Sequence, residues 1–73
     1  MTKFNRLKII LAEKDMTNRK LASLLSVGEL TVSRWVTNTR QPDIETLFKI
    51  ATALQVDVCD LLVKETTDGN EKP

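Results

Sequence analysis

Residues 17–35, TNRKLASLLSVGELTVSRW, carry the signals of two short helices joined by a tight turn. Thr17 is a favourable residue to precede a helix, because its hydroxyl can accept a hydrogen bond from a free backbone amide of the first turn. The helix that follows is predicted over residues 18–25, and three of its side chains share a buried face: Leu21, Ala22 and Leu25. This helix is short for an isolated helix in water, so packing must stabilise it.

The turn after this helix consists of residues 26–28, in which Gly28 can begin a new helix without steric cost. Val27 is expected to be a buried aliphatic residue of the turn. The next helix is predicted over residues 29–37, with two side chains on its buried face: Val32 and Trp35. The small side chain of Ala22 is expected where the two helices approach each other closely.

The helix predicted over residues 29–37 has a second face that does not contribute to the core. Its side chains are Glu29, Leu30, Thr31, Ser33 and Arg34. Two short helices joined in this way leave the outer face of the second helix free to enter the major groove of DNA. The helix that starts at Asn18 also presents free backbone amides, which can bind a phosphate. These features indicate double-stranded DNA as a partner.

Apolar residues on either side predict further helices. Residues 4–14 form an amphipathic helix whose apolar positions follow the helical spacing: Phe4, Leu7, Ile10 and Leu11. Pro42 and Asp43 mark the start of a helix over residues 44–54. Its buried side chains are expected to be Ile44, Leu47, Phe48, Ile50, Ala51 and Leu54.

Asp57 is expected to cap a final short helix, which returns two side chains to the core: Leu61 and Leu62. No stretch of the sequence has a strand pattern. The sequence therefore predicts an all-α fold, a compact five-helix bundle over residues 1–63. Residues 64–73 are polar and contain Gly69 and Pro73, so we expect a flexible tail there.

The composition excludes several kinds of chemistry. The 73 residues contain no His, which removes imidazole metal ligands and His-based acid–base catalysis. The single cysteine, Cys59, can form neither an internal disulfide nor a zinc cluster. The longest apolar run, residues 9–12, is far too short to span a membrane or to form a signal-peptide core. We expect a soluble, cytoplasmic protein without cofactor, metal or enzymatic activity.

The charges are distributed unevenly along the chain. Residues 1–40 contain eight basic and three acidic side chains, a net charge of +5, whereas residues 41–73 contain three basic and seven acidic ones, a net charge of −4. A basic half beside an acidic half is typical of a protein with one anion-binding side. Ordinary solvated charge explains the same numbers, so both interpretations stay open.

The order of these features resembles the Cro and phage-repressor (XRE-like) type of helix-turn-helix transcriptional regulator. The resemblance extends over about residues 5–63, and the helices over residues 18–25 and 29–37 form the helix-turn-helix. The segments that carry it are TNRKLA (17–22), LSVG (25–28), TVSRW (31–35), PDIETL (42–47), IATALQV (50–56) and DLL (60–62).

The resemblance implies a role for particular residues. In the family the third helix reads bases in the major groove, and the corresponding positions here are Glu29, Leu30, Thr31 and Arg34. The positions that commonly contact phosphates correspond to Asn18, Gly28, Thr37, Asn38 and Arg40. Thr17 and Arg19, at the start of the helix over residues 18–25, are expected as further phosphate contacts. Family members commonly bind two-fold operators as dimers and control transcription, often by blocking polymerase.

Three of the four base-reading positions have an alternative interpretation. Arg34 contacts a guanine or a phosphate, or else it is a solvated charge. Leu30 suits a thymine methyl group, whereas Thr31 contacts a thymine methyl or a phosphate, or is a simple surface residue. Glu29 either accepts a hydrogen bond from cytosine N4 or interacts favourably with the helix dipole.

The sequence also departs from the family pattern. Gly28 replaces a Ser or Thr, which removes a side-chain phosphate contact but leaves the backbone amide. Asn18 replaces a Gln. Asn38 stands where a Gly is usual, and Asn tolerates a left-handed backbone. Leu11 and Val36 occupy positions where family members often pair a basic residue with an acidic residue. Replacing both partners by apolar groups is compatible with the fold.

The leading hypothesis is a sequence-specific regulator, a dimeric repressor that reads an inverted repeat. The expected dimer surface comprises Val56, Val58, Cys59 and Leu62. The alternative is a protein-interaction module, such as the antidote of a toxin–antitoxin pair. In that case the acidic C-terminal half would bind a basic protein partner.

Overall fold

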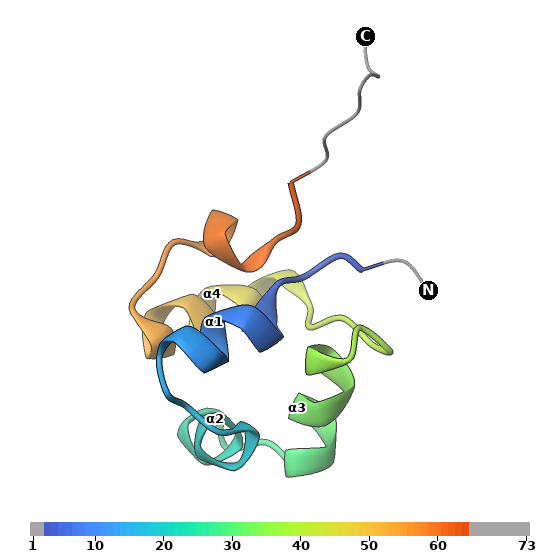
Figure 1. Cartoon of the computed structure of the whole chain (residues 1–73). Coiled ribbons are helices and arrows are strands. Elements are labelled where there is room, and N and C mark those ends of the chain that lie inside the picture. Colours follow the sequence, from blue (N-terminus) through green and yellow to red (C-terminus); the bar gives the residue numbers. More distant parts are fainter. Residues whose placement is uncertain (1–2, 65–73) are drawn as a thin grey trace, which may run out of the picture.

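The computed structural model describes residues 3–64, and all regular structure in this range is helical. The elements are α1 (Leu7–Glu13), α2 (Asn18–Leu25), α3 (Glu29–Val36), α4 (Ile44–Leu54) and the 3-10 helix η1 (Val58–Leu61). Figure 1 shows α2 and α3 on one side of the molecule, with α1 and α4 on the other. The all-α prediction is confirmed, and of the predicted tail only Lys64 lies within the described residues.

The starts of α2 and α4 are determined by their capping residues. The hydroxyl of Thr17 accepts a hydrogen bond of 3.0 Å from the backbone N–H of Lys20. The carboxylate of Asp43 accepts one of 2.8 Å from the backbone N–H of Thr46. Each cap satisfies an amide that has no carbonyl partner within its helix. Both helices were predicted with these bounds from the sequence.

The core is built from all four α-helices and η1. Its buried apolar side chains are Leu7, Ile10, Leu11, Leu21, Ala22, Val32, Trp35, Leu47, Ile50, Ala51, Leu54 and Leu61. The helix α2 packs against both α3 and α4, while η1 packs against α1 and α4. As predicted, Val32 and Trp35 hold α3 in the core. The opposite face of α3 therefore lies at the surface.

Four apolar residues that were predicted to be buried lie at the surface instead: Val27, Ile44, Phe48 and Leu62. In α4 one face alone packs into the core, and it carries Leu47, Ile50, Ala51 and Leu54. Ile44 and Phe48 are one helical turn apart on the outer face. Because α4 carries apolar residues on both faces, its sequence pattern does not show which face packs against the core.

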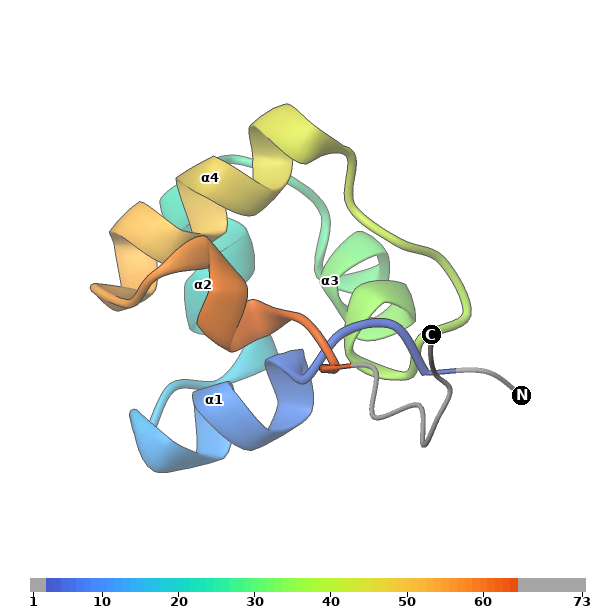
Figure 2. The same cartoon turned by 90° about the horizontal axis from the view of Figure 1, so that it is seen from above.

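The first helix is shorter than the sequence predicted. It begins at Leu7, because the residues before it pair with residues 61–63 instead of continuing the helix. The N–H of Arg6 donates to the carbonyl oxygen of Leu61 at 2.8 Å, and the N–H of Val63 donates to that of Phe4 at 2.9 Å. Figure 2 shows this blue N-terminal segment beside the red end of the described chain. Phe4 is 58% exposed and does not belong to the core.

The predicted fifth helix is a 3-10 helix, so residues 3–64 contain four α-helices and the predicted count of five helices is not confirmed. Asp57 is its N-cap residue, as predicted. The helix cannot continue beyond Leu61, because Leu62 is extended and forms an isolated antiparallel bridge with Asn5. Within residues 3–64, no helix has the length and apolar character that crossing a membrane requires.

Candidate nucleic-acid interface

The start of α2 presents groups that can bind an anion. Thr17 and Arg19 are exposed, and Asn18 is half-buried. The hydroxyl of Thr17 accepts from Lys20 and still has its own proton to donate. The amide of Lys20 is therefore taken by the cap. The first two amides of the helix, at Asn18 and Arg19, have no carbonyl partner within it and can donate to a phosphate oxygen.

The turn before α3 does not require a glycine. Gly28 is the N-cap residue of α3 and has φ −74°, a value that any residue adopts. A Cβ at this position would meet only the Thr31 hydroxyl oxygen, at an ordinary contact distance of 3.8 Å. A Ser or Thr would therefore be accommodated here, and Gly28 leaves the surface beside α3 free of a side chain.

The side chains predicted to read bases are all exposed on α3: Glu29, Leu30, Thr31 and Arg34. The leucine among them is 63% exposed at the first turn of the helix. Glu29 also lies in the first turn, where a negative charge interacts favourably with the helix dipole. The outer face of α3 thus combines an apolar contact, hydrogen-bonding groups and a guanidinium.

The loop after α3 folds back onto the end of that helix. The carbonyl oxygen of Arg34 accepts hydrogen bonds from the N–H groups of Thr39, at 2.9 Å, and Arg40, at 3.1 Å. The hydroxyl of Thr37 donates to the carbonyl oxygen of Ser33 at 3.0 Å and lies 2.9 Å from the Thr39 hydroxyl. These bonds hold the exposed Arg40 close to the C-terminal end of α3.

A hollow between α3 and the start of α4 brings several of these residues together. Its lining includes two predicted base-reading residues, Thr31 and Arg34, and one predicted phosphate-binding residue, Arg40. Asp43, the N-cap residue of α4, lies at the same hollow. The structure therefore places two positive side chains from different elements at one concave surface.

The family of the chain follows from residues 7–61, which match the family described as "Helix-turn-helix". The chain belongs to the helix-turn-helix family. The resemblance to the Cro and phage-repressor type is confirmed. The chain is also similar to the crystal structure of a "putative DNA-binding protein" from Bacteroides fragilis, with 46% identity and a TM-score of 0.80. That similarity covers 81% of this chain and 95% of the other. No curated protein matches the sequence.

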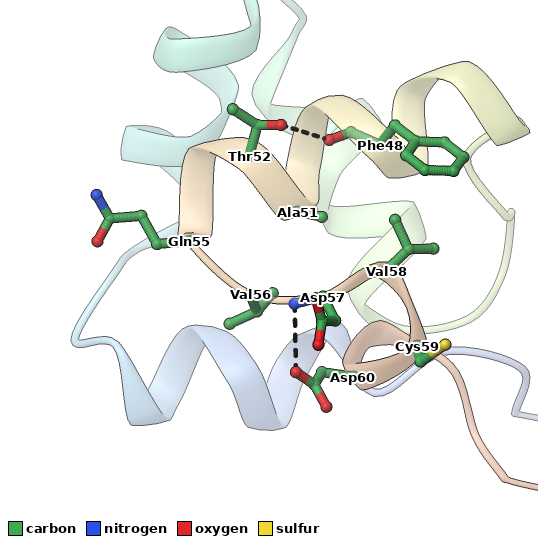
Figure 3. A pocket seen from close by; sticks show the side chains of 9 residues that line it. All are labelled: Phe48, Ala51, Thr52, Gln55, Val56, Asp57, Val58, Cys59 and Asp60. Atoms are coloured by element: carbon green, nitrogen blue, oxygen red, sulfur yellow. Dashed lines mark hydrogen bonds between the residues drawn. The ribbon is translucent and has the colours of Figure 1, made fainter.

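In this helix-turn-helix domain, three of the predicted dimer residues line a second hollow, between α4 and η1: Val56, Val58 and Cys59. In Figure 3 the ring of Phe48 lies on the same side of the hollow as Val58, and Cys59 lies below Val58. Phe48 is 58% exposed and was predicted to be a core residue. Leu62 does not line this hollow.

Asn38, in the loop after α3, differs from the other residues that were predicted to contact phosphates. It has the expected left-handed backbone, with φ 62°. Its side chain is buried, however, and forms hydrogen bonds with the backbone of Phe4 and Asn5. The side chain is therefore not available at the surface. Sequence reasoning missed Asn5 and Gln41, which take part in the same hydrogen-bond network. The unusual Asn at position 38 was the signal that could have revealed this network.

The N-terminal end of α4 carries a negative charge beside this surface. Hydrogen bonds from Thr46, first from its side chain and then from its backbone, hold the pKa of Asp43 below its ordinary value of 3.8, and the charge of Lys49 adds to this effect. Asp43 is therefore ionised at neutral pH. Among residues 3–64, no three His, Cys, Asp or Glu side chains are grouped in a way that would hold a metal ion.

Proposed function

We propose that this protein is a sequence-specific, double-stranded DNA-binding transcriptional regulator that acts as a dimeric repressor. The main observation in support is the outer face of α3, which exposes Leu30, Thr31 and Arg34 next to the hollow that contains Arg40. The family and the neighbouring structure support the DNA-binding part of this proposal.

The chemistry of α3 suits the major groove. A guanidinium such as that of Arg34 can donate two hydrogen bonds to O6 and N7 of guanine, and Leu30 can cover a thymine methyl group. Glu29 can accept from cytosine N4, and Thr31 can contact a methyl group or a phosphate. The proposed backbone contacts come from the start of α2 and from the loop after α3: Thr17, Asn18, Arg19, Gly28, Thr37 and Arg40. We leave Asn38 out of this set, because its side chain is buried.

The proposed dimer uses the hollow beside Phe48. Apolar side chains from α4 and from the region of η1 meet there: Phe48, Val56, Val58 and Cys59. A second copy that covers Phe48 would remove a largely exposed aromatic ring from water, which favours association. In a two-fold dimer on DNA, the two recognition helices would lie about 34 Å apart on one face of the duplex. Such a dimer would repress by occupying the promoter.

The experiment that tests the proposal is selection from a pool of random duplex DNA at moderate salt, followed by sequencing of the retained fragments. Enrichment of an inverted repeat would support a dimeric regulator and supply its operator. A single enriched half-site would retain DNA reading but contradict the dimer. No enrichment by the folded protein would overturn the proposal and favour the protein-interaction module instead.

A further inference from the structure

The side chain of Asn5 connects three parts of the molecule. Its Oδ1 accepts a hydrogen bond of 3.0 Å from the N–H of Leu7, which starts α1. Its Nδ2 donates to the carbonyl oxygen of Trp35, at 2.9 Å, and to Oε1 of Gln41, at 2.7 Å. One buried amide group therefore joins the first helix, the end of α3 and the loop that leads to α4.

Asn38 completes the same network from the other side. Its Oδ1 accepts from the backbone N–H groups of Phe4, at 2.8 Å, and Asn5, at 3.0 Å, and from Nε2 of Gln41, at 3.1 Å. Its Nδ2 donates to the carbonyl oxygen of Asn5 at 3.2 Å. The left-handed backbone at Asn38 would suit glycine at least as well. The side chain is therefore present for these bonds rather than for the turn.

The bonds of this network hold two positions in the loop between α3 and α4. Asn38 and Gln41 lie within that loop, and Thr39 and Arg40 are the residues between them. The N–H groups of Thr39 and Arg40 in turn bond to the carbonyl oxygen of Arg34. The N-terminal segment thus fixes both ends of the short stretch that carries Arg40.

We propose that Asn5 and Asn38 are positioning residues for DNA binding, which hold the loop so that Arg40 reaches the DNA backbone while α3 lies in the groove. This inference rests on the proposed function. A loop that is ordered before binding loses less conformational freedom when it contacts a phosphate, so its contact contributes more to affinity. Without the network, the loop that carries Arg40 is disordered before binding, and the contribution of Arg40 to DNA affinity is lost.

The variant that tests this inference is Asn38→Gly, because glycine retains the left-handed backbone and removes only the side chain. We expect faster amide hydrogen exchange at Thr39 and Arg40, with the amides in the middle of α4 unchanged. We also expect the dependence of log K on log salt to flatten by about one unit, the loss of one phosphate contact. Ile50→Val is the control, since it destabilises the core of α4 away from the loop.

A second measurement combines this change with Arg40→Gln. In the wild-type background Arg40→Gln should flatten the salt dependence by about one unit, and in the Asn38→Gly background it should have no further effect. Equal effects in both backgrounds, or unchanged exchange at Thr39 and Arg40, would overturn the positioning role alone. Loss of affinity in Ile50→Val equal to that in Asn38→Gly would attribute the effect to stability and overturn it as well. If the wild-type protein binds no duplex, both this inference and the proposed function fail.

Discussion

The backbone N–H of Arg40 donates a hydrogen bond of 3.1 Å to the carbonyl oxygen of Arg34. The residue with the strongest potential for base recognition is thus bonded directly to a residue proposed to bind the DNA backbone. Both side chains also line the hollow between α3 and α4. Because their backbones are connected, α3 cannot shift in the groove without moving the loop. Base reading and backbone contact are therefore expected to form together.

Arg34→Ala should separate base reading from general affinity. We expect a loss of about 1–3 kcal/mol on the selected operator and relaxed specificity at one base pair, because a bidentate contact with guanine is removed. The measurement is a binding titration against the operator and against its single-base variants. Lys14→Ala is the control, an exposed cation after the end of α1. An equal loss on all sequences would make Arg34 a phosphate contact instead.

Neutralising the proposed phosphate contacts should weaken binding to every sequence by a similar factor. Arg19→Gln and Arg40→Gln should each flatten the dependence of log K on log salt by about one unit, since each removes one counterion-releasing contact. Both side chains are exposed, so we expect the fold to be retained. Titrations at several salt concentrations measure this slope. An unchanged slope in either variant would reassign that arginine as a solvated surface charge.

The parts of the fold that the sequence predicted well depend on local interactions. Thr17 and Asp43 cap helices through bonds to residues three positions ahead, and the starts of α2 and α4 follow from them. The buried face of α3, with Val32 and Trp35, follows from helical spacing within one short segment. The same spacing places its predicted base-reading residues on the opposite, exposed face.

The parts that the sequence did not predict depend on distant partners. The late start of α1 reflects pairing of Asn5 with Leu62, and the burial of Asn38 reflects bonds to residues more than thirty positions earlier. Apart from the unusual Asn at position 38, no local pattern indicates such pairings. The exposure of Phe48 was missed for a related reason, since an apolar residue on a helix gives the same signal whether it faces the core or a partner.

Phe48→Lys should disrupt the proposed dimer without unfolding the protein. The ring is 58% exposed, so the substitution removes little core packing, while a charge in the covered hollow opposes association. Sedimentation analysis should show a shift from dimer to monomer, and affinity for the inverted repeat should fall toward that for a half-site. Ile44→Lys is the matched control, on the exposed face of α4 but outside this hollow. A dimer that persists in Phe48→Lys would place the interface elsewhere.

Asp43 should contribute to stability in a way that depends on pH at the acidic end of the range. Its pKa in the folded protein is lower than its ordinary value of 3.8, chiefly because of the hydrogen bonds from Thr46. The unfolded chain therefore binds this proton more readily, so the stabilisation is fully present above the ordinary value and is lost as the pH falls through the folded value. Asp43→Asn retains a good N-cap residue but cannot titrate. Urea unfolding midpoints measured from neutral pH down to below 3.8 should decline less steeply for Asp43→Asn than for the wild type. Identical declines would show that the ionised cap does not contribute to the acid sensitivity of this domain.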